Sequence, residues 1–284
     1  MAIYNFISTV WSENLYQELD KQYIGVRNCN RDFEGEIKEK GNVVRICGIE
    51  PVEVFDYDKN IDMNTPSDLS DNYRDLVIDH AKCFNFQIDD IDRVQASPKL
   101  LGLAMKNAAS ALANTADRYV YTLCSGATNV INEANVSEDN IVDLLIDART
   151  KLMSKNVSDT SDVVIEVTPE IAGMILKAKV ALSTDNGEAL ENGCLGSIGG
   201  CKIYVSNNLT KAKIEGGTTH KCVVRTKRAV AYAEQISEVE AYRPELRFAD
   251  AVKGLMLYGA KIVYPEELVI LDIACMDDMI DIEE

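Results

Sequence analysis

Residues 247–266, with the sequence RFADAVKGLMLYGAKIVYPE, decide the fold of this chain. The stretch reads as two short apolar runs that hinge at Gly259, and Pro265 stops the second run before another begins at Leu268. Short apolar runs bounded by glycine and proline are typical of strands in a sheet. No side chain in the stretch places a nucleophile beside a base, so it predicts packing and no catalysis.

The size and composition of the chain limit the classes of protein to which it can belong. The chain has 284 residues, of which 46% are hydrophobic, and this is enough for one large domain or two modest ones. No apolar run reaches the roughly 18 residues of a membrane span, and the N-terminus lacks the features of a secretory signal. Eight cysteines without the spacing of a disulfide framework indicate reduced, mostly buried thiols in a cytosolic setting.

Charge argues against nucleic acid as a direct partner. The net charge is -17, and the Lys and Arg residues are dispersed and form no stripe. A surface this acidic repels phosphate backbones and keeps the unassembled protein soluble. Any self-association must therefore be driven by specific contacts between copies or be sensitive to salt.

The first third of the chain predicts extended, exposed elements. Residues 5–23 predict a helix that would act as an arm, because little follows it closely and its apolar side needs something to pack against. Residues 33–38 and 43–47 flank a turn and predict a hairpin, a strand is expected at 52–55, and residues 56–72 predict an exposed loop.

Residues 73–89 return as strands in this reading. Leu76, Ile78 and His80 would share one face, and Phe84, Phe86 and Ile88 would alternate after them. Two paired strands are only marginally stable alone, so we expect a neighbouring subunit to supply the missing surface.

A long helix is predicted to begin at Ser97-Pro98 and to run for about 26 residues. Its length is indicated by apolar residues that recur every three or four residues. A second helix is expected at 137–152 behind the capping residue Ser137, and a third at 168–182. Strands are expected at 163–167, 201–205 and 221–225, and a glycine-dense turn at 192–200. Residues 228–235 are ambiguous between helix and strand.

The order of these elements, an arm, an extended hairpin loop, a long helix, a compact α/β region and returning strands, resembles the tailed-phage major capsid protein family. Four local patterns also resemble that family: FEGEI with GNVVRI within residues 33–46, CFNFQIDD at 83–90, residues 196–206 and residues 247–265. The resemblance implies an α+β fold of the Hong Kong 97 type. Its parts would be an N-arm (1–32), an E-loop with flanking strands (33–96), a peripheral domain with the spine helix (97–136), an axial domain (137–225) and the returning peripheral strands with the C-terminus (226–284).

The resemblance implies a subunit of an icosahedral shell that encloses the DNA genome of a tailed bacteriophage. Such subunits form pentamers and hexamers through the axial domain, while the E-loop and the N-arm reach over adjacent subunits. Portal and decoration proteins are further partners, and because the chain starts directly at the arm, a separate scaffolding protein or none is implied. Some relatives join subunits by a Lys–Asn isopeptide bond, but Lys59 and Asn60 indicate only an exposed loop, and we do not transfer that chemistry.

Candidate chemical sites are weak in this sequence. Cys194, Cys201, His220 and Cys222 fit no zinc spacing, so buried, small apolar cysteines are the favoured interpretation. His220 and Cys222 would share one face of a strand as a Cys–His dyad, which we disfavour. His80 fits a histidine satisfied within a sheet.

Phosphate and calcium sites are disfavoured as well. Residues 193–202 contain glycines and a lysine but lead into a strand and lack the Gly-Lys-Ser/Thr of a phosphate loop. Asp89, Asp90 and Asp92 lack the glycine and glutamate of a calcium loop. The acidic residues after 276 read as a solvated end. We therefore assign no catalytic, cofactor-binding or metal-binding residue, and we expect neither a cofactor nor a membrane partner.

Two other functions remain open from the sequence. The first is an encapsulin-like nanocompartment shell on the same fold, which a cargo enzyme with a docking tail would distinguish from a phage. The second is a cytosolic α/β enzyme, which would need a deep pocket with converging polar groups.

Overall fold

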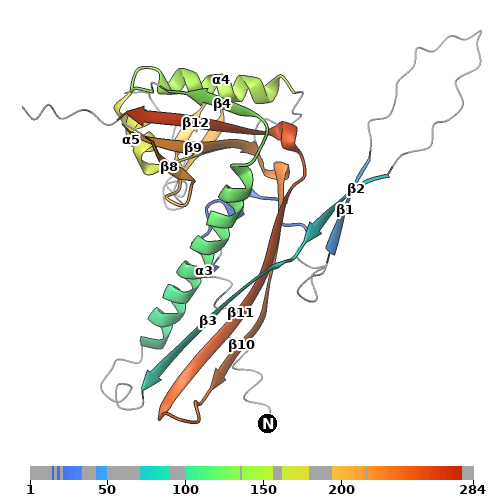
Figure 1. Cartoon of the computed structure of the whole chain (residues 1–284), viewed down its shortest axis with the longest axis vertical. Coiled ribbons are helices and arrows are strands. Elements are labelled where there is room, and N and C mark those ends of the chain that lie inside the picture. Colours follow the sequence, from blue (N-terminus) through green and yellow to red (C-terminus); the bar gives the residue numbers. More distant parts are fainter. Residues whose placement is uncertain are drawn as a thin grey trace, which may run out of the picture.

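The computed structural model describes residues 15, 18–19, 22–33, 43–49, 71–89, 100–134, 136–155, 162–178, 194–214 and 217–276. The molecule is elongated (Figure 1). A seven-stranded sheet with two helices forms one end, and a three-stranded sheet with one long helix extends from it to the other end. A two-stranded ribbon projects from the side.

The long helix α3 (Leu100–Cys124) lies along the three-stranded sheet. Its predicted apolar stripe is confirmed: Leu112 and Ala116 are buried, and Met105, Tyr119 and Leu123 pack against the same core. The predicted start at residues 97–98 lies outside the described residues. A 25-residue helix spans roughly 37 Å at 1.5 Å per residue, so α3 supports most of the length of this sheet.

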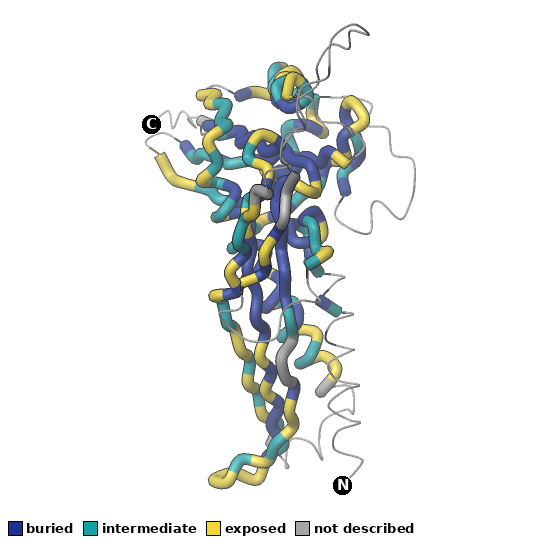
Figure 2. Tube along the Cα trace, turned by 90° about the vertical axis from the view of Figure 1, so that its right-hand side faces the viewer, coloured by how far each residue is buried: buried dark blue, intermediate teal, exposed yellow. Residues whose placement is uncertain are grey.

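The three-stranded sheet is antiparallel, in the order β10 (Val230–Tyr242), β11 (Ala249–Ile262), β3 (His80–Asp89). The predicted hinge at Gly259 is wrong, because β11 passes through Gly259 without interruption and pairs there with Ala233. The stretch 228–235, ambiguous in the sequence, begins with the short helix η3 (Lys227–Ala229) and continues as β10. Figure 2 shows the sheet buried near the body and exposed at its far end.

The ribbon consists of β1 (Val43–Ile49) and β2 (Asp71–Val77), paired antiparallel with Val43 opposite Val77. The predicted hairpin partner of β1 at 33–38, except Phe33, lies outside the described residues, and so do the turn 39–42, the strand 52–55 and the loop up to residue 70. The predicted return over 73–89 is divided into two strands, β2 and β3, because Ile78 and Asp79 belong to neither.

The seven-stranded sheet is mixed. Its strands, in spatial order, are β4 (Val130–Glu133), β12 (Leu268–Met276), β9 (Gly217–Thr226), β5 (Val163–Val167), β7 (Cys201–Val205) and β6 (Cys194–Ile198), with β8 (Lys211–Ile214) paired to β9. The pairs β4–β12 and β5–β7 are parallel, and the other pairs are antiparallel. One apolar cluster joins this sheet to α4 (Ile141–Met153) and α5 (Pro169–Lys177).

Three predicted boundaries in this region need correction. Helix α4 begins at Ile141 behind Asn140, not behind Ser137, whose backbone N–H instead donates to the side chain of Asn140. Helix α5 ends at Lys177, short of the predicted residue 182. Most of the expected turn at 192–200 is strand β6, and the hairpin turn itself is made by Gly199 and Gly200, with φ angles of 58° and 85°.

Two short connections join the two sheets. Strand β9 continues through η3 into β10, and β11 continues through η4 (Pro265–Glu267) into β12. Arg228 and Thr226 both donate hydrogen bonds to the carboxylate of Glu267, so the two connections are held together. Among the residues described above, no helix has the length and apolar character needed to cross a membrane.

Candidate functional site

The structure separates the four residues considered as a metal site. Cys194 and Cys201 lie on β6 and β7, whereas His220 and Cys222 lie on β9. Strand β5 lies between β9 and β7, which separates β9 from β7 by about 10 Å at the usual strand spacing, and β6 lies one strand farther away. Within the described part of the chain, no three His, Cys, Asp or Glu side chains are grouped as metal ligands.

His220 and Cys222 do share one side of β9, but the surroundings of both side chains fit a role in packing and not in catalysis. The Nδ1 atom of His220 lies 3.1 Å from the hydroxyl oxygen of Thr168 and 3.8 Å from a carboxylate oxygen of Glu170, which Lys211 also contacts. Burial lowers the pKa of His220 and raises the pKa of Cys222 to about 12. A neutral histidine beside a protonated thiol is not an activated nucleophile.

The remaining candidates are scattered. Residues 194–202 form the β6–β7 hairpin, where the glycines make a turn. His80 begins β3 and stacks on Tyr258, with its ring centroid 4.2 Å from that of Tyr119. Asp89 ends β3, while Asp90, Asp92, Lys59 and Asn60 lie outside the described residues.

The segment 22–33, which we call the arm root, is fixed inside the body of the same chain. The carboxylate of Asp117, on α3, accepts backbone N–H groups of Ile24 at 3.0 Å and Val26 at 2.8 Å. Asp117 is 1% exposed, and this burial raises its pKa to about 6 although backbone hydrogen bonds lower it. The carboxylate thus satisfies the N–H groups at the start of the short helix η1 (Val26–Asn28).

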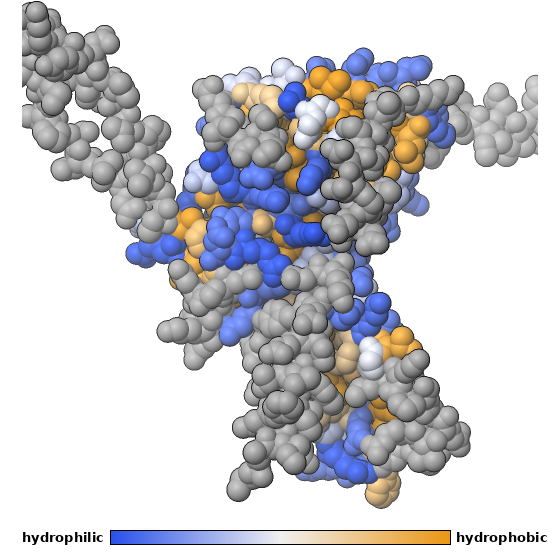
Figure 3. All heavy atoms as spheres, turned by 180° about the vertical axis from the view of Figure 1, so that it is seen from behind, coloured by the Kyte–Doolittle hydropathy of each residue, from blue (hydrophilic) through white to orange (hydrophobic). Residues whose placement is uncertain are grey.

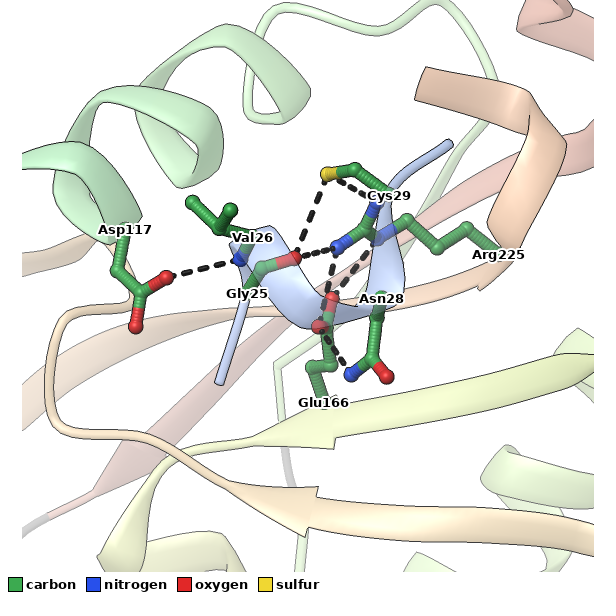
Figure 4. Close-up of polar contacts among 7 residues, drawn as sticks. All are labelled: Gly25, Val26, Asn28, Cys29, Asp117, Glu166 and Arg225. Atoms are coloured by element: carbon green, nitrogen blue, oxygen red, sulfur yellow. Dashed lines mark hydrogen bonds and ion pairs between the residues drawn. The ribbon is translucent and has the colours of Figure 1, made fainter. Parts of the chain in front are cut away.

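A buried ion pair holds the other side of the arm root (Figure 4). Arg225 on β9 and Glu166 on β5 make a bidentate contact, with N–O distances of 2.9 and 3.1 Å, and both side chains are fully buried. Arg225 also donates to the carbonyl oxygen of Gly25 at 2.7 Å and to the sulfur of Cys29 at 3.2 Å, and Asn28 donates to Glu166 at 2.9 Å. The arm root therefore completes the hydrogen bonding of a charge pair in the seven-stranded sheet.

A third set of contacts ties the arm root to β10. Tyr23 and Tyr232 donate hydrogen bonds to Glu234, and Arg31 forms an ion pair with it at 3.0 Å. Asn30 forms a parallel backbone bridge with the start of β10. The contacts of the arm root thus span α3, β5, β9 and β10.

The sequence predicted that the apolar side of the arm needs a surface to pack against. The same chain supplies that surface. Leu15 and Leu19 are 1% and 0% exposed, and they belong to the cluster that includes α3 and the three-stranded sheet. Residues 15, 18, 19 and 22 are helical, as predicted, and the rest of residues 5–21 lies outside the described residues.

The ribbon has one covered face and one exposed face. Leu76 and Ile78, with Val44 and Ile46, pack on β10 and β11 of the same chain. The opposite face carries exposed apolar side chains, and their relative exposures are 51% for Val43, 54% for Tyr73 and 44% for Val77. Between them Arg45 contacts Asp75 at 3.4 Å and lies 4.6 Å from the centroid of the Tyr73 ring. The chain therefore supplies half of the surface that the ribbon needs and leaves an apolar half open.

A second exposed apolar surface lies at the turn between β10 and β11. Leu246 is 97% exposed and Phe248 is 81% exposed, the highest values among the described large apolar side chains. Figure 3 shows apolar atoms at this far end of the long sheet. Exposed apolar side chains that gather at one end of a molecule are typical of a contact between molecules.

Sequence reasoning missed the arm root. Glu166 stands in the run Val163–Val167 and Arg225 stands after Val223 and Val224, so each is a charged residue inside an otherwise apolar strand. That pattern is a signal of a buried pair, because charges inside a core need a partner. Nothing local to Asp117 distinguishes it from an exposed helical acid.

Comparison with known proteins identifies the family of this chain. A family model described as phage capsid protein matches residues 78–271, more than half of the chain. A search of curated proteins found no match.

Solved structures agree with that family. The chain is similar to a protein of Mycobacterium phage Che8, with 30% identity and a TM-score of 0.68 over 88% of this chain and 91% of that one. It is similar to the capsid of Ralstonia phage GP4, with 12% identity and a TM-score of 0.67 over 92% and 91%. A virus-like particle from Pyrococcus furiosus has 12% identity and a TM-score of 0.57 over 95% and 100%, a likeness of fold alone.

These matches confirm the predicted α+β capsid fold and favour the phage protein over the nanocompartment. An elongated molecule with a projecting ribbon and exposed apolar tips fits a protein that assembles with copies of itself. The chain belongs to the phage capsid protein family: it is a major capsid protein with the tailed-phage capsid fold, a structural component of the virion shell.

Proposed function

We propose that this chain forms pentamers and hexamers that close into an icosahedral shell around the DNA genome, with the ribbon of each subunit lying over its neighbour. Its role is structural, and it needs no catalytic residue, metal or cofactor. Assembly takes place in the host cytoplasm, with a scaffolding protein, a portal and decoration proteins as further partners.

The proposed division of labour follows the domain boundaries expected from the sequence. Residues 1–32 act as the N-arm and residues 33–96 as the E-loop with its flanking strands. Residues 97–136 and 226–284 make the peripheral domain, which carries the three-stranded sheet. Residues 137–225 make the axial domain, which would surround the local symmetry axis.

The observation that carries the proposal is the exposed face of the ribbon. Val43 and Val77 are directly opposite each other in the β1–β2 register, so their side chains form one apolar surface. Tyr73 extends that surface toward the far end of the ribbon. Apolar surface on a projecting two-stranded element is stabilised when a second molecule covers it.

The acidic charge of the chain supports a shell that encloses DNA without holding it tightly. At -17 per subunit, electrostatic repulsion opposes assembly at long range and is screened by salt. Contacts at short range, such as the apolar ribbon face, must overcome that repulsion.

Electron microscopy of the purified protein tests this function. We expect closed particles tens of nanometres across from the wild-type chain. The double variant Val43→Asp/Val77→Asp should remain folded, because both side chains are exposed, but it should yield mostly unassembled subunits.

The matched control is Val43→Ile/Val77→Ile, which keeps the face apolar and should assemble like the wild type. Analytical ultracentrifugation of the three proteins at equal concentration gives the assembled fraction. A wild-type chain that stays monomeric at high concentration, or an Asp variant that assembles normally, would contradict the proposal.

A further inference from the structure

Strand β3 leaves the three-stranded sheet at a defined position. Its register with β11 runs from Asp89 opposite Ala249 to His80 opposite Tyr258, and it ends there. The next residue of β11 is Gly259. From His80 back toward β2, the chain moves off the edge of the sheet and crosses over β11 (Figure 1).

The crossing point requires glycine at position 259. A Cβ atom there would overlap the carbonyl oxygen of Val77, and it would lie 3.1 Å from the carbonyl carbon of Val77 and 3.2 Å from the Cα of Ile78. These neighbours are backbone atoms, so they cannot move aside as a side-chain end would. Glycine in a strand is typical of such a close approach of another backbone.

Small residues continue this flat surface on the next strand. Ala233 is the register partner of Gly259 on β10, and Ala231 lies two residues before it on the same face. Both belong to the cluster that buries Leu76 and Ile78. The base of the ribbon therefore sits directly on the backbone of the sheet.

Arg74 fastens the ribbon at a second point. Its guanidinium donates hydrogen bonds to the carbonyl oxygens of Val263 and, at 3.4 Å, of Ile262 at the end of β11. These contacts and the crossing at Gly259 lie at the two ends of the short stretch from Arg74 to Ile78. Two separated points of contact fix an angle, whereas one would leave the ribbon able to pivot.

We propose that Gly259 and Arg74 are positioning residues that set the direction in which the ribbon leaves the body, and thereby the angle at which it meets a neighbouring copy. This inference rests on the proposed function. A seven-residue strand is about 23 Å long at 3.3 Å per residue, so a small tilt at the base moves the far end of the ribbon by a larger distance. Subunits with a tilted ribbon would then join at a changed angle.

The test compares Gly259→Ala and Arg74→Ala with the matched control Gly102→Ala. A Cβ at Gly102, on α3, meets nothing within 4 Å, so this variant reproduces the same chemical change without a clash. Hydrogen exchange of the unassembled proteins is measured at residues 43–49 and 71–78 and, for reference, along β10 and β11. The diameters of assembled particles are measured by electron microscopy.

We expect exchange at least tenfold faster in the ribbon of both variants, with the reference strands unchanged apart from the residues that touch the ribbon. Particles should have altered diameters or fail to close, whereas Gly102→Ala should match the wild type. If Gly259→Ala does not fold, Arg74→Ala decides the question, because it removes contacts at a half-buried side chain without adding atoms.

The inference would be overturned if both variants formed particles with the diameter of the wild type. It would also be overturned if hydrogen exchange in the ribbon were unchanged in both variants. The proposed function fails in a different way. In that case the wild-type chain itself forms no particles, while the exchange comparison still reports whether the two residues hold the ribbon.

Discussion

The arm root and the ribbon are two segments that leave the same body and are attached to it by different means. The arm root is held by buried charges and backbone hydrogen bonds that involve α3, β5, β9 and β10. The ribbon is held through one apolar face, a glycine contact and one arginine. The first segment is therefore part of the folded core, and the second keeps an apolar face available for another molecule.

This difference predicts where substitutions act. Changes at the arm root should lower the free energy of unfolding of the isolated subunit, because each lost contact removes a hydrogen bond from a buried polar group. Changes on the exposed ribbon face should leave that free energy nearly unchanged and should alter assembly. The three predictions below test this contrast in order of decreasing effect on stability.

The largest effect is expected for Arg225→Met. It leaves Glu166 as a buried carboxylate without its cation, and removing one partner of a buried pair costs about 3–5 kcal/mol. Denaturant unfolding of the subunit gives the change in free energy of unfolding. The double variant Arg225→Met/Glu166→Leu should recover at least half of the loss, because the apolar pair leaves no uncompensated charge at these two positions. A loss below about 1 kcal/mol for the single variant would show that the pair does not hold the arm root.

The second effect is a pH dependence that comes from Asp117. Its pKa of about 6 in the folded chain exceeds the ordinary value of 3.8, so the folded state binds the proton more tightly than the unfolded state. The contribution of Asp117 to the free energy of unfolding is therefore fully present below pH 4 and is lost as the pH rises through 6. A difference of two pKa units corresponds to a loss of about 3 kcal/mol.

The comparison with Asp117→Asn isolates this contribution, because asparagine does not titrate. Unfolding free energies of both proteins are measured between pH 4 and pH 7. The wild-type value should fall relative to the variant across this window. A constant difference between the two proteins would mean that Asp117 has an ordinary pKa in the folded state.

The smallest effect on stability is expected for Arg45→Ala on the ribbon. Arg45 is 63% exposed, and its contacts with Asp75 and the Tyr73 ring are of the kind worth at most about 1 kcal/mol. Thermal unfolding of the subunit should therefore change little, while the assembled fraction measured by sedimentation should change. A loss comparable to that of Arg225→Met would remove the distinction between the two segments.

Local sequence patterns predicted much of the fold. The stripe along α3 follows from apolar residues that recur every three or four residues. The strands Val163–Val167 and Cys201–Val205 were predicted with their observed bounds. Boundaries set by a single capping residue were less reliable. Ser137 stands before the start of α4 but does not cap it, because Asn140 takes that position.

The contacts that position the ribbon and the arm root join residues far apart in the sequence, so local patterns could not show them. Gly259 indicated a hinge because glycine often interrupts strands, but its neighbours Val77 and Ile78 lie about 180 residues away and need a flat strand beneath them. Glu166 and Arg225 are 59 residues apart. Elements with a strong local pattern, such as α3 and β5, were thus predictable from the sequence, whereas the way in which the elements meet was not.

The joint at η3 and η4 has a mechanical consequence. Both strands of the long hairpin continue as covalent backbone into adjacent strands of the other sheet, and Glu267 clasps Arg228 where they pass. A pull on the hairpin tip is therefore shared by two strands, β9 and β12, which are drawn in the same direction, so it does not peel their ladder open one bond at a time. In this respect the backbone forms a continuous beam from the hairpin tip to the seven-stranded sheet.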